Sequence, residues 1–202
     1  FPVNKMQKSG QWEKSKYILE LGQRIYPYSA DIQFLLAKAY KNLKDVTTAE
    51  KKLVIAAGLA PAYIEPVMDK LGLSPKNIKG AYYSVGWSMY YIGKFDKAAK
   101  RFNQYFDNGG NYYVAYNGLG LTKLYQKKYA ESEKYFQKAL EVRKGAKGLE
   151  KLEYLDSEAY SGLGWAKYNQ KKYSESKKYF DTALKKWPYY IKATSGLNTL
   201  QY

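Results

Sequence analysis

The sequence predicts an all-α protein built from antiparallel helix pairs that stack on one another. Two observations predict this class. A pattern of glycine, aromatic and small residues recurs along the 202-residue chain. Within each copy, small residues at the predicted helix contacts let two helices approach, while large side chains leave an apolar face that only the next pair can cover. We therefore expect helices throughout and no sheet.

The pattern is clearest in the second half of the chain. Tyr116–Gly120 and Tyr160–Gly164 share the order Tyr, Gly, Leu, Gly, and an aromatic residue, Tyr129 or Tyr173, follows each of them. Both copies then continue with a serine, a Tyr-Phe pair and an Ala-Leu pair: Ser132, Tyr135, Phe136, Ala139 and Leu140 in one, and Ser176, Tyr179, Phe180, Ala183 and Leu184 in the other.

These marks resemble the tetratricopeptide repeat, which has a period of about 34 residues. Earlier copies fit the same pattern, with Tyr82, Gly86, Phe95, Ala98 and Phe102 in one, and Leu36, Ala37, Ala49, Leu53, Ala56 and Pro61 in the other. The resemblance implies a right-handed superhelical solenoid. It assigns 1–202 to a single domain with a partial copy in 1–29, copies at about 30–61, 79–112, 113–146 and 157–190, and the start of a further helix in 191–202.

Two insertions interrupt the period, at 62–78 and at 147–156. In the first, apolar residues between Ile64 and Leu71 predict one short extra helix that stops at Gly72. Ser74 and Pro75 fit the N-cap and first position of the next helix. In the second, Gly145 and Gly148 break a helix, and the apolar residues from Leu149 predict that the following helix starts early and is about three turns longer than usual.

The composition excludes much common chemistry. The sequence has no Cys and no His, so disulfides, thiolate metal sites, imidazole bases and the common catalytic triads are excluded. Gly118 and Gly120 lie within a predicted helix, where a phosphate-binding loop would need a preceding strand and a turn. Glu150 and Glu153 share a helix face among lysines, which is typical of surface ion pairs. We expect no enzyme activity, no cofactor and no metal.

The chain is basic and rich in tyrosine. Its 34 Lys and Arg residues against 18 Asp and Glu residues give a formal net charge of +16, and it has 24 Tyr residues. Such a charge favours acidic partners, but lysines spread over outer helix faces also keep a solenoid soluble, and the sequence leaves both interpretations open. No apolar stretch of the sequence, Leu53–Ile64 included, reaches the roughly 18 residues that would span a bilayer.

The resemblance also implies a binding surface. In such repeats, positions 2, 5, 9, 12 and 13 of each first helix line a concave groove. The residues that we expect to bind a partner there are Phe34, Lys38, Tyr83, Trp87, Tyr90, Asn117, Leu121, Tyr125, Ser161, Trp165, Tyr168 and Asn169. Positions 9 and 12 also fit packing against a neighbouring helix, and this alternative stays open for their aromatic residues.

The expected function is a non-catalytic scaffold that binds a peptide or protein segment, acidic in one version of the hypothesis, within a bacterial cell-envelope assembly. The alternative is a carbohydrate-binding protein of the cell wall, and a nucleic-acid binder is less favoured because nearly all cations are Lys rather than Arg. The chain lacks the Lys and Asn pair with which related repeats hold a chaperone carboxyl terminus. The absence of Cys and the start at Phe1 favour a periplasmic or surface protein with a removed leader, and a cytoplasmic location is the alternative.

Overall fold

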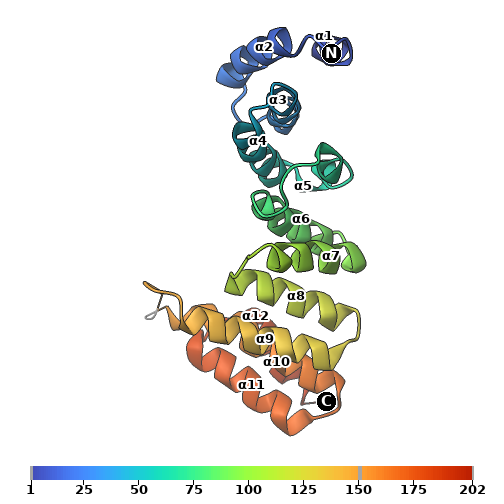
Figure 1. The fold of residues 1–202 in the computed structure, drawn as a ribbon. Coiled ribbons are helices and arrows are strands. Elements are labelled where there is room, and N and C mark those ends of the chain that lie inside the picture. Colours follow the sequence, from blue (N-terminus) through green and yellow to red (C-terminus); the bar gives the residue numbers. More distant parts are fainter. Residues whose placement is uncertain (1, 150–151, 202) are drawn as a thin grey trace. The chain divides into compact units, whose positions relative to one another are not determined.

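The structure, a computed structural model, describes residues 2–149 and 152–201 (Figure 1). Every regular element in these ranges is an α-helix or a short 3-10 helix, and none is a strand. The prediction of an all-α fold of helix pairs is confirmed. The contacts divide the chain into two compact units. The prediction that residues 1–202 make a single domain stays a prediction.

Unit 1 consists of Phe1–Ile92 and Asn103–Gly110. Its elements are α1 (Pro2–Lys8), α2 (Trp12–Ile25), α3 (Ala30–Asn42), α4 (Val46–Leu59), α5 (Pro61–Ile64), the 3-10 helix η1 (Met68–Leu71) and α6 (Lys79–Tyr91). Consecutive helices from α1 to α4 pack against each other, and α6 packs on α4 and α5. Ser29 and Asp45 accept hydrogen bonds from the amides of Ile32 and Thr48, so each caps the helix that follows.

Unit 2 consists of Gly93–Phe102 and Asn111–Tyr202. Helix α7 (Phe95–Asp107) gives its first residues to unit 2 and its last to unit 1. The other elements of unit 2 are α8 (Tyr113–Tyr125), α9 (Tyr129–Lys144), η2 (Glu153–Asp156), α10 (Ser157–Asn169), α11 (Tyr173–Lys186) and α12 (Ile191–Thr199). The pairs α8–α9 and α10–α11 are joined by contacts of α10 with α8 and α9, and α12 packs on α10 and α11.

The second helices of unit 2 each insert a phenylalanine ring between glycines of two first helices. Phe136 and Phe180 are fully buried. A Cβ atom added to Gly120 would lie 2.9 Å from the Phe136 ring, and one added to Gly162 of the next pair would overlap the same ring. Gly164 and Gly196 relate to Phe180 in the same way. These glycines are therefore required by close packing, because any side chain there would take the space of the ring.

The first insertion differs from its prediction. It contains two short helical segments, α5 and η1, rather than one helix, and Gly72 ends the second with a left-handed φ of 56°. The next helix, α6, begins at Lys79 and not at Ser74 and Pro75 as predicted. The reason is a contact that is distant in sequence. Buried Glu50 of α4 accepts hydrogen bonds from the Ser74 amide and from Asn77 Nδ2, which hold this segment as a turn.

The prediction of a lengthened helix after the second insertion is wrong. Helix α10 starts at Ser157, and η2 is a separate 3-10 turn before it. Arg143 at the end of α9 donates to the carbonyl oxygen of Leu152, and its Nε lies 3.1 Å from Asp156 Oδ1. The guanidinium is buried, so these partners replace water and fix the turn. Residues 150 and 151, with Glu150 of the predicted ion pair, lie outside the described residues.

Candidate functional site

The first helices of unit 2 form a row in which α8 contacts α10 and α10 contacts α12. The predicted binding residues at position 5 of this row are buried. Asn117 is 4% exposed and Ser161 is 1% exposed. Binding of a partner by these residues would require their polar ends to be accessible. Close packing accounts for this burial, since the glycines of this row lie directly against the Phe136 and Phe180 rings of the second helices.

Two polar atoms in this row have no hydrogen-bond partner among the described residues: Asn117 Oδ1 and Ser161 Oγ. Leaving a buried polar atom unpaired costs about 1 to 3 kcal/mol, so such atoms are uncommon in protein interiors. The two atoms occupy the same repeat position on helices that touch. A donor that reached these atoms would therefore not compete with an existing hydrogen bond.

Trp165 of α10 lies at the edge of the core rather than free in a groove. Its ring is half-buried and packs edge to face against Phe180, with centroids 5.3 Å apart. Its Nε1 donates to the main-chain oxygen of Lys192 on α12, at 3.3 Å. The polar end of this indole is therefore already used. For Trp165, the structure favours the alternative that position 9 packs against a neighbouring helix.

The remaining predicted residues of unit 2 differ in exposure. Tyr168 packs edge to face on Trp165, with centroids 5.7 Å apart. Exposed Asn169 donates through Nδ2 to the main-chain oxygen of Trp165. Leu121 is buried, whereas Tyr125 is exposed and stacks on Phe95 with centroids 5.0 Å apart. The accessible part of the row thus consists of aromatic and amide side chains, and Leu121 is buried beneath the surface.

In unit 1, α6 carries a cluster of aromatic side chains. Trp87 stacks on Tyr91 with an interplanar angle of 25° and meets Tyr90 edge on, with centroids 5.6 and 5.7 Å apart respectively. Tyr83 is half-buried and packs on Tyr105. Tyr91 is 76% exposed, so its stacked pair with Trp87 presents a flat aromatic face. The structure brings Trp87 and Tyr90 together as predicted residues and adds Tyr91 to them.

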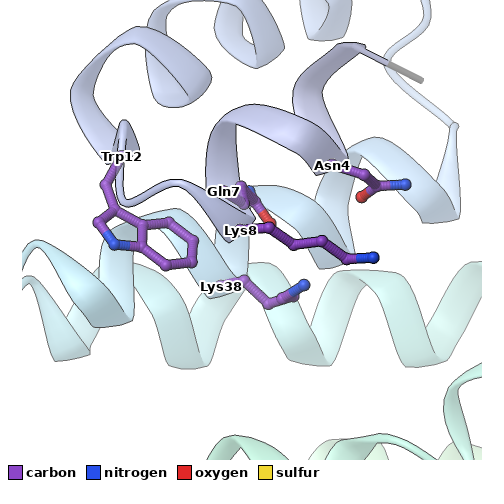
Figure 2. Close-up of a pocket in the computed structure, with 5 residues that line it drawn as sticks. All are labelled: Asn4, Gln7, Lys8, Trp12 and Lys38. Atoms are coloured by element: carbon purple, nitrogen blue, oxygen red, sulfur yellow. The ribbon is translucent and has the colours of Figure 1, made fainter.

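The two predicted residues of α3 are half-buried, and one of them lines a pocket. Lys38 forms the pocket wall together with Asn4, Gln7 and Lys8 of α1 and Trp12 of α2 (Figure 2). Sequence reasoning missed these partners of Lys38. The signal available was the tryptophan of the partial first copy, which the repeat pattern alone did not connect with α3.

The described parts of the chain hold no group of three or more acidic side chains placed to bind a metal ion. None of their helices has both the length and the apolar character needed to cross a bilayer. Position 2 of α10 is Glu158, which accepts hydrogen bonds from Tyr190 and from Lys192 Nζ, the latter at 2.8 Å. This acidic residue of the row is thus neutralised by α12.

Comparison with known proteins identifies the helix pairs. Residues 112–187 match a family model described as tetratricopeptide repeat. No curated protein sequence matches the chain.

The fold resembles three solved structures at low sequence identity. The crystal structure of YrrB, described as a TPR protein with an unusual peptide-binding site, has a TM-score of 0.56 at 12% identity, covering 97% of this chain and 88% of YrrB. The second TPR domain of human RPAP3, in complex with an HSP70 peptide, has a TM-score of 0.53 at 21% identity, covering 64% of this chain and 99% of that domain. A MamA crystal structure has a TM-score of 0.51 at 18% identity, covering 91% and 93%. Residues 112–187 therefore match tetratricopeptide repeats, and the fold of the described residues is similar to that of solved tetratricopeptide-repeat proteins.

Proposed function

We propose that the chain is a non-catalytic scaffold that binds a peptide or protein segment along the first helices of its repeats. The observation that carries this proposal is the pair of buried atoms in unit 2, Asn117 Oδ1 and Ser161 Oγ, without partners among the described residues. A peptide backbone offers N–H donors and C=O acceptors at regular intervals. Oδ1 accepts and Oγ both donates and accepts, so the two side chains suit such a backbone.

Peptide complexes of similar folds support this choice. YrrB is described as having a peptide-binding site, and RPAP3 was solved with an HSP70 peptide. A chaperone carboxyl terminus is a poor candidate for this chain, because its positions 5 and 9 lack the Lys and Asn pair. They hold Phe34 and Lys38, Tyr83 and Trp87, Asn117 and Leu121, and Ser161 and Trp165. The row favours a segment bound through its backbone.

The test compares binding with stability. Peptides selected from a displayed random library on the purified chain would be titrated into wild-type protein and into Asn117→Ala by calorimetry. We expect Asn117→Ala to weaken the selected peptides about tenfold, the equivalent of one lost hydrogen bond of about 1.4 kcal/mol. The same variant should unfold at an equal or higher temperature, since it removes a buried atom that has no partner.

Lys134→Ala is the matched control, because Lys134 is exposed on the second helix α9. It should change neither binding nor stability by much, as an isolated surface charge contributes little. Loss of stability in Asn117→Ala with unchanged peptide affinity would show that Asn117 is a packing residue, and the proposed row would then be wrong.

A carbohydrate ligand is the second candidate, favoured by the Trp87–Tyr91 stack of unit 1, in which Tyr91 is exposed. Flat aromatic faces of this kind supply contact area to a ring at small entropy cost. A glycan array is the direct test. Binding of a defined cell-wall polymer that is lost in Tyr91→Ala, with no peptide selected from the library, would favour it over peptide binding.

We also propose that this scaffold works in a bacterial cell envelope, in the periplasm or at the surface. The support is compositional: no Cys and a net charge of +16, which suits anionic surroundings. Fractionation of cells of the source organism, followed by immunodetection, tests it. Recovery with cytoplasmic proteins would replace this proposal by the cytoplasmic alternative.

A further inference from the structure

Unit 1 contains a pocket of about 320 Å³ between its first three helices. Asn4, Gln7 and Lys8 of α1, Trp12 of α2 and Lys38 of α3 line it. Figure 2 shows the ammonium groups of Lys8 and Lys38 on one side of the pocket, the Trp12 ring on the other side and Gln7 between them. The pocket therefore combines positive charge, an aromatic wall and a central amide.

The orientation of the Gln7 amide is fixed by its neighbours. Nε2 donates to Ser15 Oγ and to the main-chain oxygen of Leu35, both at 3.0 Å. A carbonyl oxygen only accepts, so the amide cannot be turned around without losing this bond. Oε1 is buried and has no partner among the described residues. The side chain thus presents a held acceptor that lacks a donor, at a cost of about 1 to 3 kcal/mol.

The ligand that completes this pocket needs three features together. It must supply a donor to Gln7 Oε1, a negative charge for Lys8 and Lys38, and an apolar part for the Trp12 ring. An acidic residue in a peptide has the first two side by side, as a main-chain N–H and a side-chain carboxylate, and its neighbour in sequence supplies the third.

We propose that this pocket binds an acidic side chain of a peptide segment, with the lysines holding the carboxylate and Gln7 accepting from the backbone. This inference rests on the proposed function, because it names the chemistry of the bound segment. Two separate ammonium groups and a net charge of +16 favour a segment with more than one acidic side chain over a single carboxyl terminus. A nucleotide is disfavoured, since the pocket offers no Arg among its lining residues.

The experiment uses two capped tripeptides, acetylated and amidated, of sequence Asp-Leu-Asp and Asn-Leu-Asn. Each is titrated into the full chain at low salt, and the indole N–H signal of Trp12, assigned with Trp12→Phe, is followed by NMR. We expect saturable shifts with Asp-Leu-Asp and affinity at least tenfold lower for Asn-Leu-Asn, since charge-assisted hydrogen bonds are worth about 1.5 to 3 kcal/mol. Added salt should weaken the acidic peptide.

Lys38→Gln should weaken Asp-Leu-Asp about fivefold, the equivalent of roughly 1 kcal/mol for a partly exposed ion pair. Lys14→Gln is the matched control, because it removes the same charge from an exposed position of α2 outside the pocket. An equal loss of affinity for Asp-Leu-Asp in both variants would mean that overall charge causes the effect, and the proposed binding in this pocket would be wrong.

Three further outcomes overturn the inference: equal binding of both capped peptides, binding only by a peptide with a free carboxyl terminus, or tighter binding by AMP than by Asp-Leu-Asp. Failure here is separable from failure of the proposed function. If library peptides still depend on Asn117 while Asp-Leu-Asp leaves Trp12 unmoved, only this inference is wrong. If Asp-Leu-Asp binds and Asn117→Ala has no effect, the proposed row of unit 2 is wrong.

Discussion

The helix pair α3–α4 of unit 1 and the pairs of unit 2 fill the same repeat positions with different residues. In unit 2, positions 8 and 24 hold Gly120 with Phe136, and Gly164 with Phe180. In unit 1, they hold Ala37 and Leu53, both fully buried. In unit 1 the alanine adds a methyl group at position 8, and the leucine at position 24 is smaller than phenylalanine. The space between the helices is therefore still filled. The comparison shows that the repeat conserves packed volume more strictly than residue type.

The largest expected effect comes from adding a methyl group to a glycine whose space is already filled by a phenylalanine ring. Gly162→Ala should lower the free energy of unfolding by about 3 kcal/mol, because its Cβ would overlap buried Phe136 and a tightly packed core resists the shift. Urea denaturation followed by circular dichroism measures it. An equal or higher midpoint would show that the ring moves freely and that glycine is not required at this position.

The control has the opposite sign. Gly58 lies in α4 of unit 1, and a Cβ added there meets nothing within 4 Å. Gly58→Ala should therefore stabilise by about 0.5 to 1 kcal/mol, the helix preference of Ala over Gly. Combining Gly162→Ala with Phe136→Leu replaces the ring by the side chain that α4 of unit 1 has at the same position. The double variant should recover part of the loss, which tests whether the overlap with the ring is its cause.

The two units also differ at position 11 of the first helix. In α3 of unit 1 it is Tyr40, which donates to a Glu20 carboxylate oxygen. Burial and this bond raise the pKa of Tyr40 from its usual value to about 12. In unit 2, it is Lys123 or Lys167, and Lys167 lies 2.8 Å from Glu133 and 3.0 Å from Glu175. Lys167 holds the pKa of Glu175 below its ordinary value.

Tyr40→Phe should cost about 1.5 kcal/mol at pH 7, the worth of a hydrogen bond to a charged group. Because the pKa of Tyr40 is higher in the folded state, the stability that it adds is present below pH 10 and lost as pH rises toward 12. The urea midpoints of wild type and variant should therefore converge over that interval. A constant difference would contradict the raised pKa. Glu175 has the reverse sign, so its contribution is lost as pH falls.

Much of the fold could be predicted because the repeat pattern consists of residues that are close together in the sequence. The glycine and aromatic spacing predicted the first residues of α3 and α8, since the helix starts follow from the period where no insertion precedes them. The insertions could not be predicted, because Glu50 and Arg143 hold them through contacts that no local pattern shows. A local 3-10 turn and an early helix start have the same apolar spacing over so few residues.

The candidate site was less accessible to sequence reasoning. The row of first helices followed from the resemblance. The exposure of each side chain, however, depends on which residues of the neighbouring helix pack against it. Asn117 is covered because small residues draw its neighbours close, and the indole of Trp165 finds its partner on α12. Gln7 and Trp12 belong to the partial first copy, where the repeat pattern is too incomplete to assign positions.

A smaller effect separates the pair α3–α4 from the pairs α8–α9 and α10–α11 at position 20. Ser132 and Ser176 donate to the main-chain oxygens of Gly120 and Gly164, at 2.8 and 2.9 Å, while α4 has Ala49 there. Ser132→Ala should therefore cost about 1 kcal/mol, the net worth of one buried hydrogen bond. Its effect on the urea midpoint is the measurement, and Ser195→Ala, at an exposed position of α12, should leave the midpoint unchanged.

The smallest expected effect concerns a feature that both units share, the turn after each first helix. Lys44, Lys127 and Lys171 have left-handed φ values of 67°, 61° and 62°, where Gly93 has 75°. In each lysine turn the next amide bonds to the carbonyl oxygen five residues earlier, as Lys172 does to Lys167, which is the helix ending that glycine favours. A side chain makes this conformation costly, by about 1 kcal/mol or more, and glycine relieves it while adding freedom to the unfolded chain. Lys171→Gly should therefore stabilise by about 0.5 kcal/mol, and Lys44→Gly in unit 1 by the same amount. Gly93→Lys should lose a similar amount. If Lys171→Gly and Lys44→Gly changed the free energy of unfolding in opposite directions, the two units would differ in how these turns are stabilised, as they differ in the contacts of Phe136.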